Sequence, residues 1–241
     1  MGISLRKIFY IAHLFNKDGG IFLKINYEDI VKNTQIRTYI EESDKTLSEL
    51  GFTEHSFKHV TRVSEVAGYI LTNLGYDKHE IELAKIAGYM HDMGNVINRI
   101  DHAQSGAIMA FRILDNMKVE PKDIATIITA IGNHDEKTAF PVNAVTAALI
   151  IADKTDVRSS RVRNNDKASF DQHDRVNFAV KESKVKVVDK HHIELRIKLD
   201  KKMCSVMDYF EIFIDRMILC RKAAEKLGVE FRLIINKERV I

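Results

Sequence analysis

The sequence contains little of what loop-rich, disulfide-bonded or membrane-spanning proteins need. Only 2 of its 241 residues are proline and 11 are glycine, which argues against a loop-rich β-sandwich and favours helices. The 2 cysteines, Cys204 and Cys220, form neither a disulfide framework nor a CxxC zinc pair. No apolar run reaches the roughly 18 residues that a membrane-spanning helix needs. We therefore expect a cytoplasmic protein with no membrane partner.

The sequence also has little excess of one sign of charge over the other. The 37 basic and 34 acidic residues leave a formal net charge of +3, which predicts no extended nucleic-acid surface. Any recognition of an anion must then come from a local cluster of basic side chains. The first residues contain a short apolar run, but it includes His13 and lacks a small-residue cleavage site, so we do not expect a signal peptide. The hydrophobic fraction of 45% is enough to form a core.

Apolar periodicity predicts a mainly α fold whose helical domain covers residues 34–180, after an N-terminal extension at 1–33. In the extension, residues 21–25 are typical of a short strand or a packed arm. Asp77 with Glu80, and Asp101 with Gln104, have the spacing of N-terminal capping boxes. We expect six helices, at about 34–50, 56–74, 77–94, 101–114, 121–132 and 141–163.

The pattern changes after about residue 164. A polar stretch at 164–175 predicts a loop, and alternating apolar and polar residues predict a hairpin at about 184–200. An amphipathic helix at 205–227, capped by Ser205, precedes a last strand. Residues 181–241 are therefore expected to form a small α/β subdomain of β-β-α-β type. Its sheet edge could support a homodimer, and packing within the chain is an equally good explanation for the apolar face of its helix.

One predicted helix ends on a carboxylate that burial would make costly. Residues 144–153 are almost uninterruptedly apolar and should be buried nearly all round, with Asp153 at their end. A buried carboxylate without a partner is strongly destabilising. Asp153 therefore needs a metal ion or a basic neighbour such as Lys154 or Arg158, unless the helix end emerges into solvent.

Several histidines also lie at the ends of predicted apolar helices. His91 and Asp92 close one helix, His134 follows another, His102 opens a third, and His59 lies in a first turn. Imidazole and carboxylate are ligands of Zn, Fe, Mn and Co, and six such groups are enough for two ions. Taken singly, each histidine is more simply explained as a core residue with satisfied hydrogen bonds. The set becomes informative only if the helix ends meet.

Five different motifs follow one another along the chain in the order found in a known protein family. They are HVTRVSEVA (59–67), AGYMHDMGN (87–95), HAQSGA (102–107), AIGNHDE (130–136) and IIADKTD (150–156). Over about residues 55–156, the sequence resembles the HD-domain superfamily of metal-dependent phosphohydrolases, whose domain is a helical bundle. The resemblance implies that the metal ligands are His59, His91, Asp92, His102, His134 and Asp153. Asp92 would bridge two ions, with His102 and His134 serving the second. The implied cofactor is one or two divalent ions, of Fe, Mn, Co, Ni or Zn, with Mg also allowed.

The implied reaction is hydrolysis of a small phosphorylated or nucleotide substrate by metal-activated water, with Asp92 and His91 as the catalytic pair. The phosphate would need cationic donors, for which the candidates are Arg62, Lys154, Arg158 and Arg161. Arg62 lies one helical turn after His59, on the same side. A solvated helix end explains the basic run at 158–163 equally well.

Some features depart from the family. Asn95 stands where many members have a lysine that contacts phosphate, and the stretch from Asn133 lacks the His-His-Glu and Gly-Tyr-Pro elements of the cyclic-dinucleotide branch. Two alternatives therefore remain. One is a catalytically weak nucleotide- or metal-binding sensor that signals through its C-terminal subdomain. The other is an interaction protein with a closed structural metal site.

Overall fold

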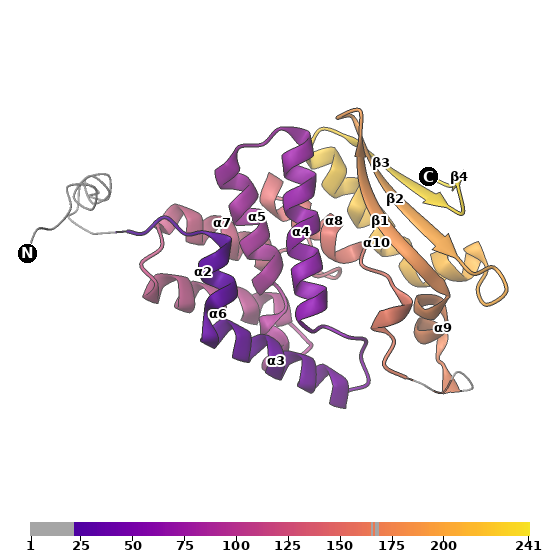
Figure 1. Ribbon diagram of the computed structural model, residues 1–241, viewed down its shortest axis with the longest axis horizontal. Coiled ribbons are helices and arrows are strands. Elements are labelled where there is room, and N and C mark those ends of the chain that lie inside the picture. The colour runs from indigo at the N-terminus through magenta and orange to yellow at the C-terminus, as the bar shows by residue number, and fades with distance from the viewer. Residues whose placement is uncertain (1–21, 165, 167–168) are drawn as a thin grey trace, which may run out of the picture.

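The structure is a computed structural model, and it describes residues 22–164, 166 and 169–241 (Figure 1). Most of the expected N-terminal extension at 1–33 therefore lies outside the described residues. Within its described part, Leu23 forms an isolated parallel bridge with Val119, and α2 spans Tyr27–Lys32. The sequence did not predict α2, which is only 6 residues long and is capped by Asn26.

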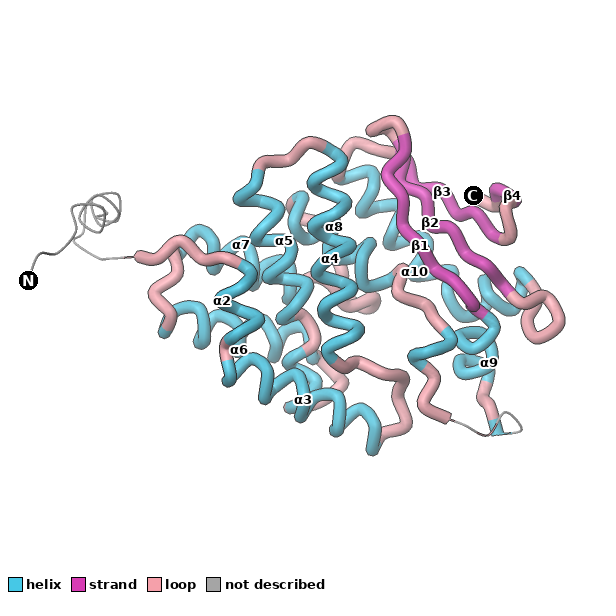
Figure 2. The backbone as a smooth tube through the Cα atoms, in the orientation of Figure 1, coloured by secondary structure: helices cyan, strands magenta, loops and turns pink. Residues whose placement is uncertain are grey.

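A bundle of helices forms the larger part of the molecule (Figure 2). Its longer helices are α3 (Thr34–Glu49), α4 (Phe57–Leu74), α5 (Lys78–Met90), α6 (His102–Asn116), α7 (Pro121–Gly132) and α8 (Ala144–Lys154). The short 3-10 helix η1 (Met93–Val96) follows α5, and a second one, η2 (Ser159–Arg161), follows α8. The mainly α fold predicted from the sequence is confirmed.

Local capping explains most helix boundaries. The side chains of Asn33, Ser56 and Asp77 accept hydrogen bonds from the first turns of α3, α4 and α5. Gly75 ends α4 in the left-handed conformation. The capping box predicted at Asp101 is wrong. Asp101 has a φ of 58° and makes no cap hydrogen bond, and Gln104 instead donates to Thr138 Oγ1 at 3.2 Å.

Helix α8 lies at the centre of the fold and is buried nearly all round, as its apolar sequence predicted. It contacts α4, α5, α7 and α10. The helix is shorter than the predicted 141–163, because Asn143 caps it at one end and the chain leaves helical geometry after Thr155 at the other. Asp156, just beyond, is turned inward toward His59 and the three arginines Arg62, Arg158 and Arg161.

The C-terminal subdomain is a small α/β unit, as predicted, with one strand and one helix more than expected. Its strands are β1 (Val180–Val188), β2 (His192–Leu199), β3 (Glu230–Ile235) and the two-residue β4 (Glu238–Arg239), in the sheet order β1-β2-β3-β4. Strands β1 and β2 form the predicted hairpin, whereas β2 and β3 are parallel because α10 (Val206–Lys226) connects them. Helix α9 (Gln172–Ala179), capped by Asp171, occupies part of the expected loop.

The subdomain and the bundle share one hydrophobic core. Helix α10 packs on α8, and β1 runs beside α4 (Figure 1). A buried hydrogen bond of 2.6 Å from Ser183 Oγ to the Thr155 carbonyl joins β1 to the end of α8.

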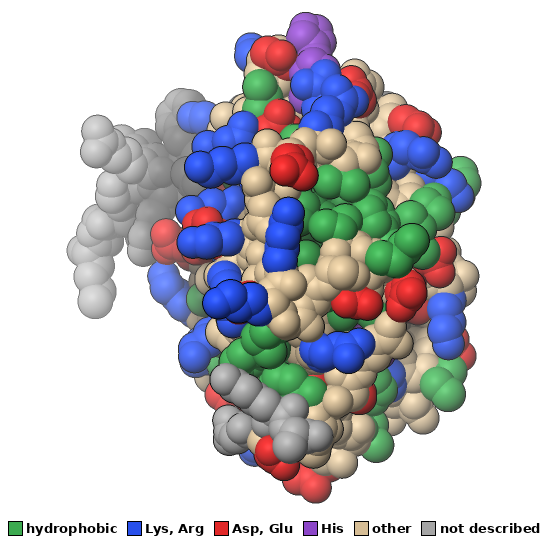
Figure 3. Space-filling view, turned by 90° about the vertical axis from the view of Figure 1, so that its right-hand side faces the viewer, with side chains coloured by type: hydrophobic (Ala, Val, Ile, Leu, Met, Phe, Trp, Pro, Cys, Tyr) green, Lys and Arg blue, Asp and Glu red, His purple; other side chains and the backbone are tan. Residues whose placement is uncertain are grey.

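On the surface, acidic and basic side chains are mixed on the face shown in Figure 3, where they surround a patch of hydrophobic side chains. Among the described residues, no helix is long and apolar enough to cross a membrane. The homodimer stays a prediction.

Candidate metal centre

Six side chains from five helix ends converge at the bottom of one cavity. His59 comes from the first turn of α4, His91 and Asp92 follow α5, and Asp153 lies in the last turn of α8. His102 is the first residue of α6, and His134 lies just after α7. The five strictly buried members are the four histidines and Asp92, while the Asp153 side chain is 13% exposed. The structure therefore brings together the whole set that the sequence singled out.

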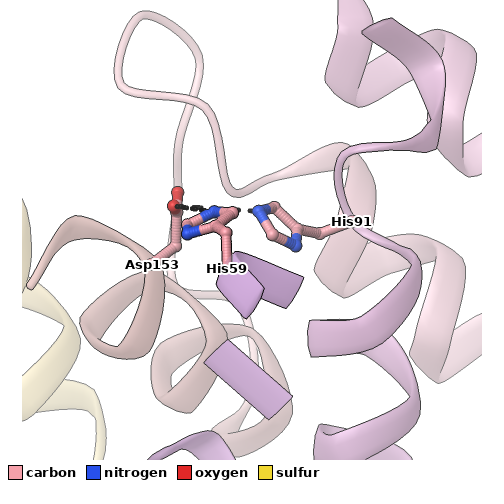
Figure 4. A group of neighbouring side chains, drawn as sticks. All are labelled: His59, His91 and Asp153. Atoms are coloured by element: carbon pink, nitrogen blue, oxygen red, sulfur yellow. Dashed lines mark ion pairs between the residues drawn. The ribbon is translucent and has the colours of Figure 1, made fainter. Parts of the chain in front are cut away.

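Asp153, His59 and His91 form one part of this cluster (Figure 4). His59 Nε2 lies 3.4 Å from Asp153 Oδ1 and 3.4 Å from Asp92 Oδ2. His91 Nε2 lies 3.0 Å from Asp92 Oδ2 and 3.7 Å from Asp153 Oδ1. Metal bonds of about 2.0–2.2 Å place neighbouring ligand atoms about 3.0–3.5 Å apart. These four residues are thus spaced as ligands around one ion would be.

His102 and His134 lie against the other carboxylate oxygen of Asp92. His102 Nε2 is 3.5 Å and His134 Nε2 is 3.9 Å from Asp92 Oδ1. The two Nε2 atoms are 3.2 Å from each other. Oδ2 of Asp92 therefore faces His59 and His91, while Oδ1 faces the other histidine pair.

The hydrogen bonds of the second ring nitrogens fix how the four imidazoles are oriented. Each Nδ1 contacts an oxygen that acts only as an acceptor, so each Nδ1 must carry a proton. The acceptors are Asp156 Oδ2 for His59 at 2.8 Å, Gly88 O for His91 at 2.9 Å, Arg99 O for His102 at 3.0 Å and Ile131 O for His134 at 2.6 Å. In a neutral imidazole, every Nε2 then presents a lone pair to the same centre.

This arrangement fits a divalent cation. His59 Nε2 and His91 Nε2 are buried and have no hydrogen-bond partner in the part of the chain that the structure describes. Four lone pairs and two carboxylates pointing at one another would repel without a positive charge between them. Two triads, His59–His91–Asp153 and His91–Asp92–His134, have ligand atoms close enough to hold an ion. The residues present therefore suit a divalent metal.

Electrostatics at the cluster favour ionised carboxylates. Burial raises the pKa of Asp92, but the charge of His91 and the close contacts of His59 and His91 outweigh it and hold that pKa well below its usual range. Burial likewise raises the pKa of Asp153, and Lys154 is the main cause of its net lowering. Burial lowers the pKa of His91, yet Asp92 and Asp153 raise it to about 10 without an ion, so a proton then supplies the missing charge. A bound cation would replace that proton.

Burial lowers the pKa of His102 and His134, so both are neutral near pH 7. For His134 the charge of His91 adds to the effect of burial. Neutral imidazole is the form that binds metals. The second histidine pair is therefore ready to act as ligands without losing a proton from Nε2.

Glycine permits the close approach that brings Asp92 to His102. A Cβ atom on Gly94 would fall against the His102 carbonyl oxygen and lie 2.5 Å from the Gly106 nitrogen. Because these are backbone atoms, no side-chain movement could relieve the overlap. The pair Gly94 and Gly106 thus allows η1 to pack directly against the first turn of α6.

A cavity of about 350 Å³ opens onto the cluster. Asp92, His102 and Asp153 form its floor, and the segment from Leu50 to Thr53, with His55, forms one wall. The C-terminal part of the chain supplies the other side, through α9 and Arg216 of α10. Among the described residues, the cationic side chains that line the cavity are Arg99, Lys154, Arg161 and Arg216, and Glu136, Asp171 and Asp174 add acidic groups to its lining.

The four predicted phosphate-binding residues fall into two groups. Lys154 and Arg161 line the cavity, although Lys154 Nζ is held 2.7 Å from Asp153 Oδ2 and Arg161 donates to the carbonyls of Glu54 and Asp156. Arg62 and Arg158 do not line this cavity, and both bind Asp156. The basic run after α8 is thus folded inward around a carboxylate.

Some residues of the site were not assigned by sequence reasoning. The sequence motifs assign no role to Asp156, although it is the last residue of one of them. Its partner His59 is 97 residues away in the chain, so no local pattern reveals the contact. Arg99 is not among the four cationic donors named from the sequence, yet its Nη1 lies 3.4 Å from His102 Nε2 and 3.1 Å from Asn95 Oδ1. His173, Asn177 and Arg216 line the cavity without any local sequence signal, since the packing of α9 and α10 places them there.

Comparison with known proteins agrees with the motifs. Residues 56–161 match the family model of the HD domain. Residues 56–161 of the chain therefore form a domain of the HD-domain superfamily. It is similar to an uncharacterised protein of Methanocaldococcus jannaschii, with 23% identity over 202 residues, which are 74% of this chain and 78% of that protein. A crystal structure described as a predicted HD superfamily hydrolase, from an uncultured Thermotogales bacterium, is 25% identical, with a TM-score of 0.42, and the match covers 56% of this chain and 75% of that one.

Proposed function

We propose that the protein is a metal-dependent phosphohydrolase that cleaves a small phosphate ester or nucleotide. The observation that carries the proposal is the cavity, which reaches the carboxylates of Asp92 and Asp153 and is lined by four cationic side chains as well as by Glu136, Asp171 and Asp174. A purely structural metal site would be closed by its ligands. Access from a cavity of about 350 Å³ instead leaves room for water and a small substrate.

The residues suit two ions that share Asp92. His59, His91 and Asp153 would hold one with Asp92 Oδ2, and His102 and His134 would hold the other with Oδ1, in agreement with the distances above. When bound, such ions activate water and stabilise charge on phosphoryl oxygens. Asn95 donates 2.9 Å hydrogen bonds to the Asp92 carbonyl and Oδ1, and thereby fixes the shared carboxylate.

The phosphate contact would come from Arg99, beside His102, and Lys154, beside Asp153. Among the four cavity cations, Arg99 is the one with no carboxylate partner in the described residues, whereas Lys154 is paired with Asp153 and Arg216 with Glu136. A half-buried guanidinium without an anion is suited to bind a phosphate group. Arg99 thus takes over the task that a lysine at position 95 performs in many members of the family.

The test is a turnover assay on purified protein with added Mn²⁺ or Co²⁺, using nucleotides and p-nitrophenyl phosphate esters. We expect metal-dependent product release that Asp92→Ala abolishes and Arg99→Ala weakens mainly through KM. Arg221→Ala, on the exposed face of α10, is the matched control and should leave both constants unchanged. Full activity of Asp92→Ala would refute the assignment.

Asn95 supports the sensor alternative, because it stands where many family members have a lysine and donates its side-chain hydrogen bond to Asp92. It predicts tight nucleotide binding in calorimetry with no product in the same assay. That outcome would replace the hydrolase proposal with a binding function for this cavity.

A further inference from the structure

A buried carboxylate beside the metal centre has no role in the function described so far. The Asp156 side chain is 0% exposed and accepts a hydrogen bond from His59 Nδ1 at 2.8 Å. Arg62 Nε lies 2.9 Å and Arg158 Nε 2.6 Å from its Oδ1. Arg161 Nη1 lies 3.8 Å from its Oδ2. Three guanidinium groups, which stay protonated, keep this carboxylate ionised, so it is only an acceptor. The proton on the shared hydrogen bond therefore belongs to His59.

We infer that Asp156 is a positioning residue that holds His59 with its Nε2 lone pair directed at the metal ion. The inference rests on the metal centre proposed above. A proton fixed on Nδ1 leaves Nε2 free to coordinate, and a carboxylate partner makes the imidazole a more basic ligand. The hydrogen bond also fixes the rotation of the ring, which lies between Asp92 and Asp153.

His59 differs in this respect from the other three histidines of the cluster. His91, His102 and His134 donate to backbone carbonyls of their own segments, three residues earlier in the chain. The partner of His59 is a side chain from the end of α8. Asp156 thus connects two elements of the site, since Asp153 lies one turn before it on the same segment.

The same carboxylate is connected to the C-terminal subdomain. Arg62 binds Asp156 through Nε and donates through Nη2 to the carbonyl of Ser183 in β1. Ser183 Oγ in turn donates to the carbonyl of Thr155. The position of His59 is therefore tied to the docking of β1 through three contacts, His59 to Asp156, Asp156 to Arg62 and Arg62 to the Ser183 carbonyl.

Asp156 would make the same contacts if it only held its arginine partners together as part of a structural ion-pair network. Metal affinity distinguishes that role from the positioning of a metal ligand. The substitution Asp156→Asn keeps the size of the side chain but lets its amide group donate to His59, which would favour the wrong tautomer. The matched control is Asp123→Asn, because Asp123 is also buried and lies 2.7 Å from a histidine, His79 Nε2, away from the cavity. Each variant replaces one carboxylate partner of a histidine with an amide.

The experiment is a calorimetric titration of metal-free protein with Co²⁺, with circular dichroism and thermal melts to verify folding. We expect Asp156→Asn to bind Co²⁺ about 10- to 100-fold more weakly than the wild type. Asp123→Asn should bind as the wild type does. Wild-type affinity in folded Asp156→Asn, or an equal loss in both variants, would overturn the inference.

A measurement on the unmodified chain covers the case in which Asp156→Asn does not fold. In the zinc-loaded wild type, long-range ¹H–¹⁵N spectra of the imidazoles should show His59 protonated at Nδ1 and metal-bound at Nε2. Coordination of zinc through Nδ1 of His59 would refute the role of Asp156. Absence of zinc binding by the wild type would instead refute the proposed function, so the two failures are distinguishable.

Discussion

The substitution Gly94→Ala should destabilise the protein and disturb the site together. The added Cβ would overlap the His102 carbonyl oxygen, and it would lie 2.5 Å from Gly106 N and 2.9 Å from the His102 carbonyl carbon. Ordinary contacts of this kind are near 3.4 Å or longer, so the first turn of α6 would have to move by about 1 Å or more. Overpacking of a tight interior costs about 1–3 kcal/mol, and here rigid backbone on both sides puts the cost at the upper end.

The assay is thermal unfolding followed by circular dichroism, with the metal content of each variant measured in parallel. For a chain of this size, about 3 kcal/mol lowers Tm by roughly 6–12 °C. Gly132→Ala is the matched control, because its Cβ would meet only Ala107 Cβ at 3.6 Å, an ordinary contact. Its helical position should make alanine neutral or stabilising by up to about 1 kcal/mol. A Gly94→Ala variant that melts within about 2 °C of the wild type would show that the close approach of η1 and α6 is not required.

Three further outcomes are expected. His102→Ala should lower the metal content from about two ions to about one per chain by elemental analysis, whereas His79→Ala, outside the cluster, should not change it; loss of both ions in His102→Ala would argue against separate ligand sets. Chelator should lower Tm by roughly 5–10 °C if the ion is present at about 100 times its Kd, since such binding adds about 2.7 kcal/mol of stability. An unchanged Tm would mean that the folded state does not bind the ion preferentially. Burial raises the pKa of Cys204 to about 11 and that of Cys220 still further, so both remain protonated thiols at pH 8 and should react slowly with iodoacetamide until the protein unfolds. Rapid labelling of the native protein at pH 8 would contradict their burial.

Much of the bundle could be predicted because its boundaries are set by local chemistry. Asn33, Ser56, Asp77 and Ser205 cap their helices with their own side chains, and Gly75 ends one with a positive φ. Alternation of apolar residues likewise predicted the β1–β2 hairpin. In each case the residues that decide the structure lie within a few positions of one another.

The departures come from contacts between distant residues. Helix α8 ends at Lys154, and Asp156 just beyond it contacts His59 and Arg62, which lie about a hundred residues away in the sequence. Helix α9 has only 8 residues and most of them are polar, so its apolar periodicity was too short to distinguish from a polar loop. The parallel pairing of β2 with β3 joins two strands that α10 separates in the sequence.

The sequence predicted the metal-ligand candidates of the site, but it did not predict the residues that form the sides of the cavity. The six ligand candidates lie at helix ends, and the order of their motifs is a strong signal. The cavity walls combine the segment from Leu50 with α9 and α10, which meet only after the subdomain packs on the bundle. Arg62 and Arg158 illustrate the limit, because their sequence positions suggested phosphate contacts and the fold turns both toward Asp156.

The central claim is that the cluster of histidines and aspartates holds metal, and anomalous scattering from crystals soaked in Mn²⁺ or Zn²⁺ tests it most directly. We predict an anomalous peak about 2.0–2.2 Å from His59 Nε2, His91 Nε2 and the carboxylates of Asp92 and Asp153. A second, nearby peak should lie between His102 and His134. Absence of any peak among these side chains in soaked crystals, or a peak bound only elsewhere on the molecule, would contradict the account.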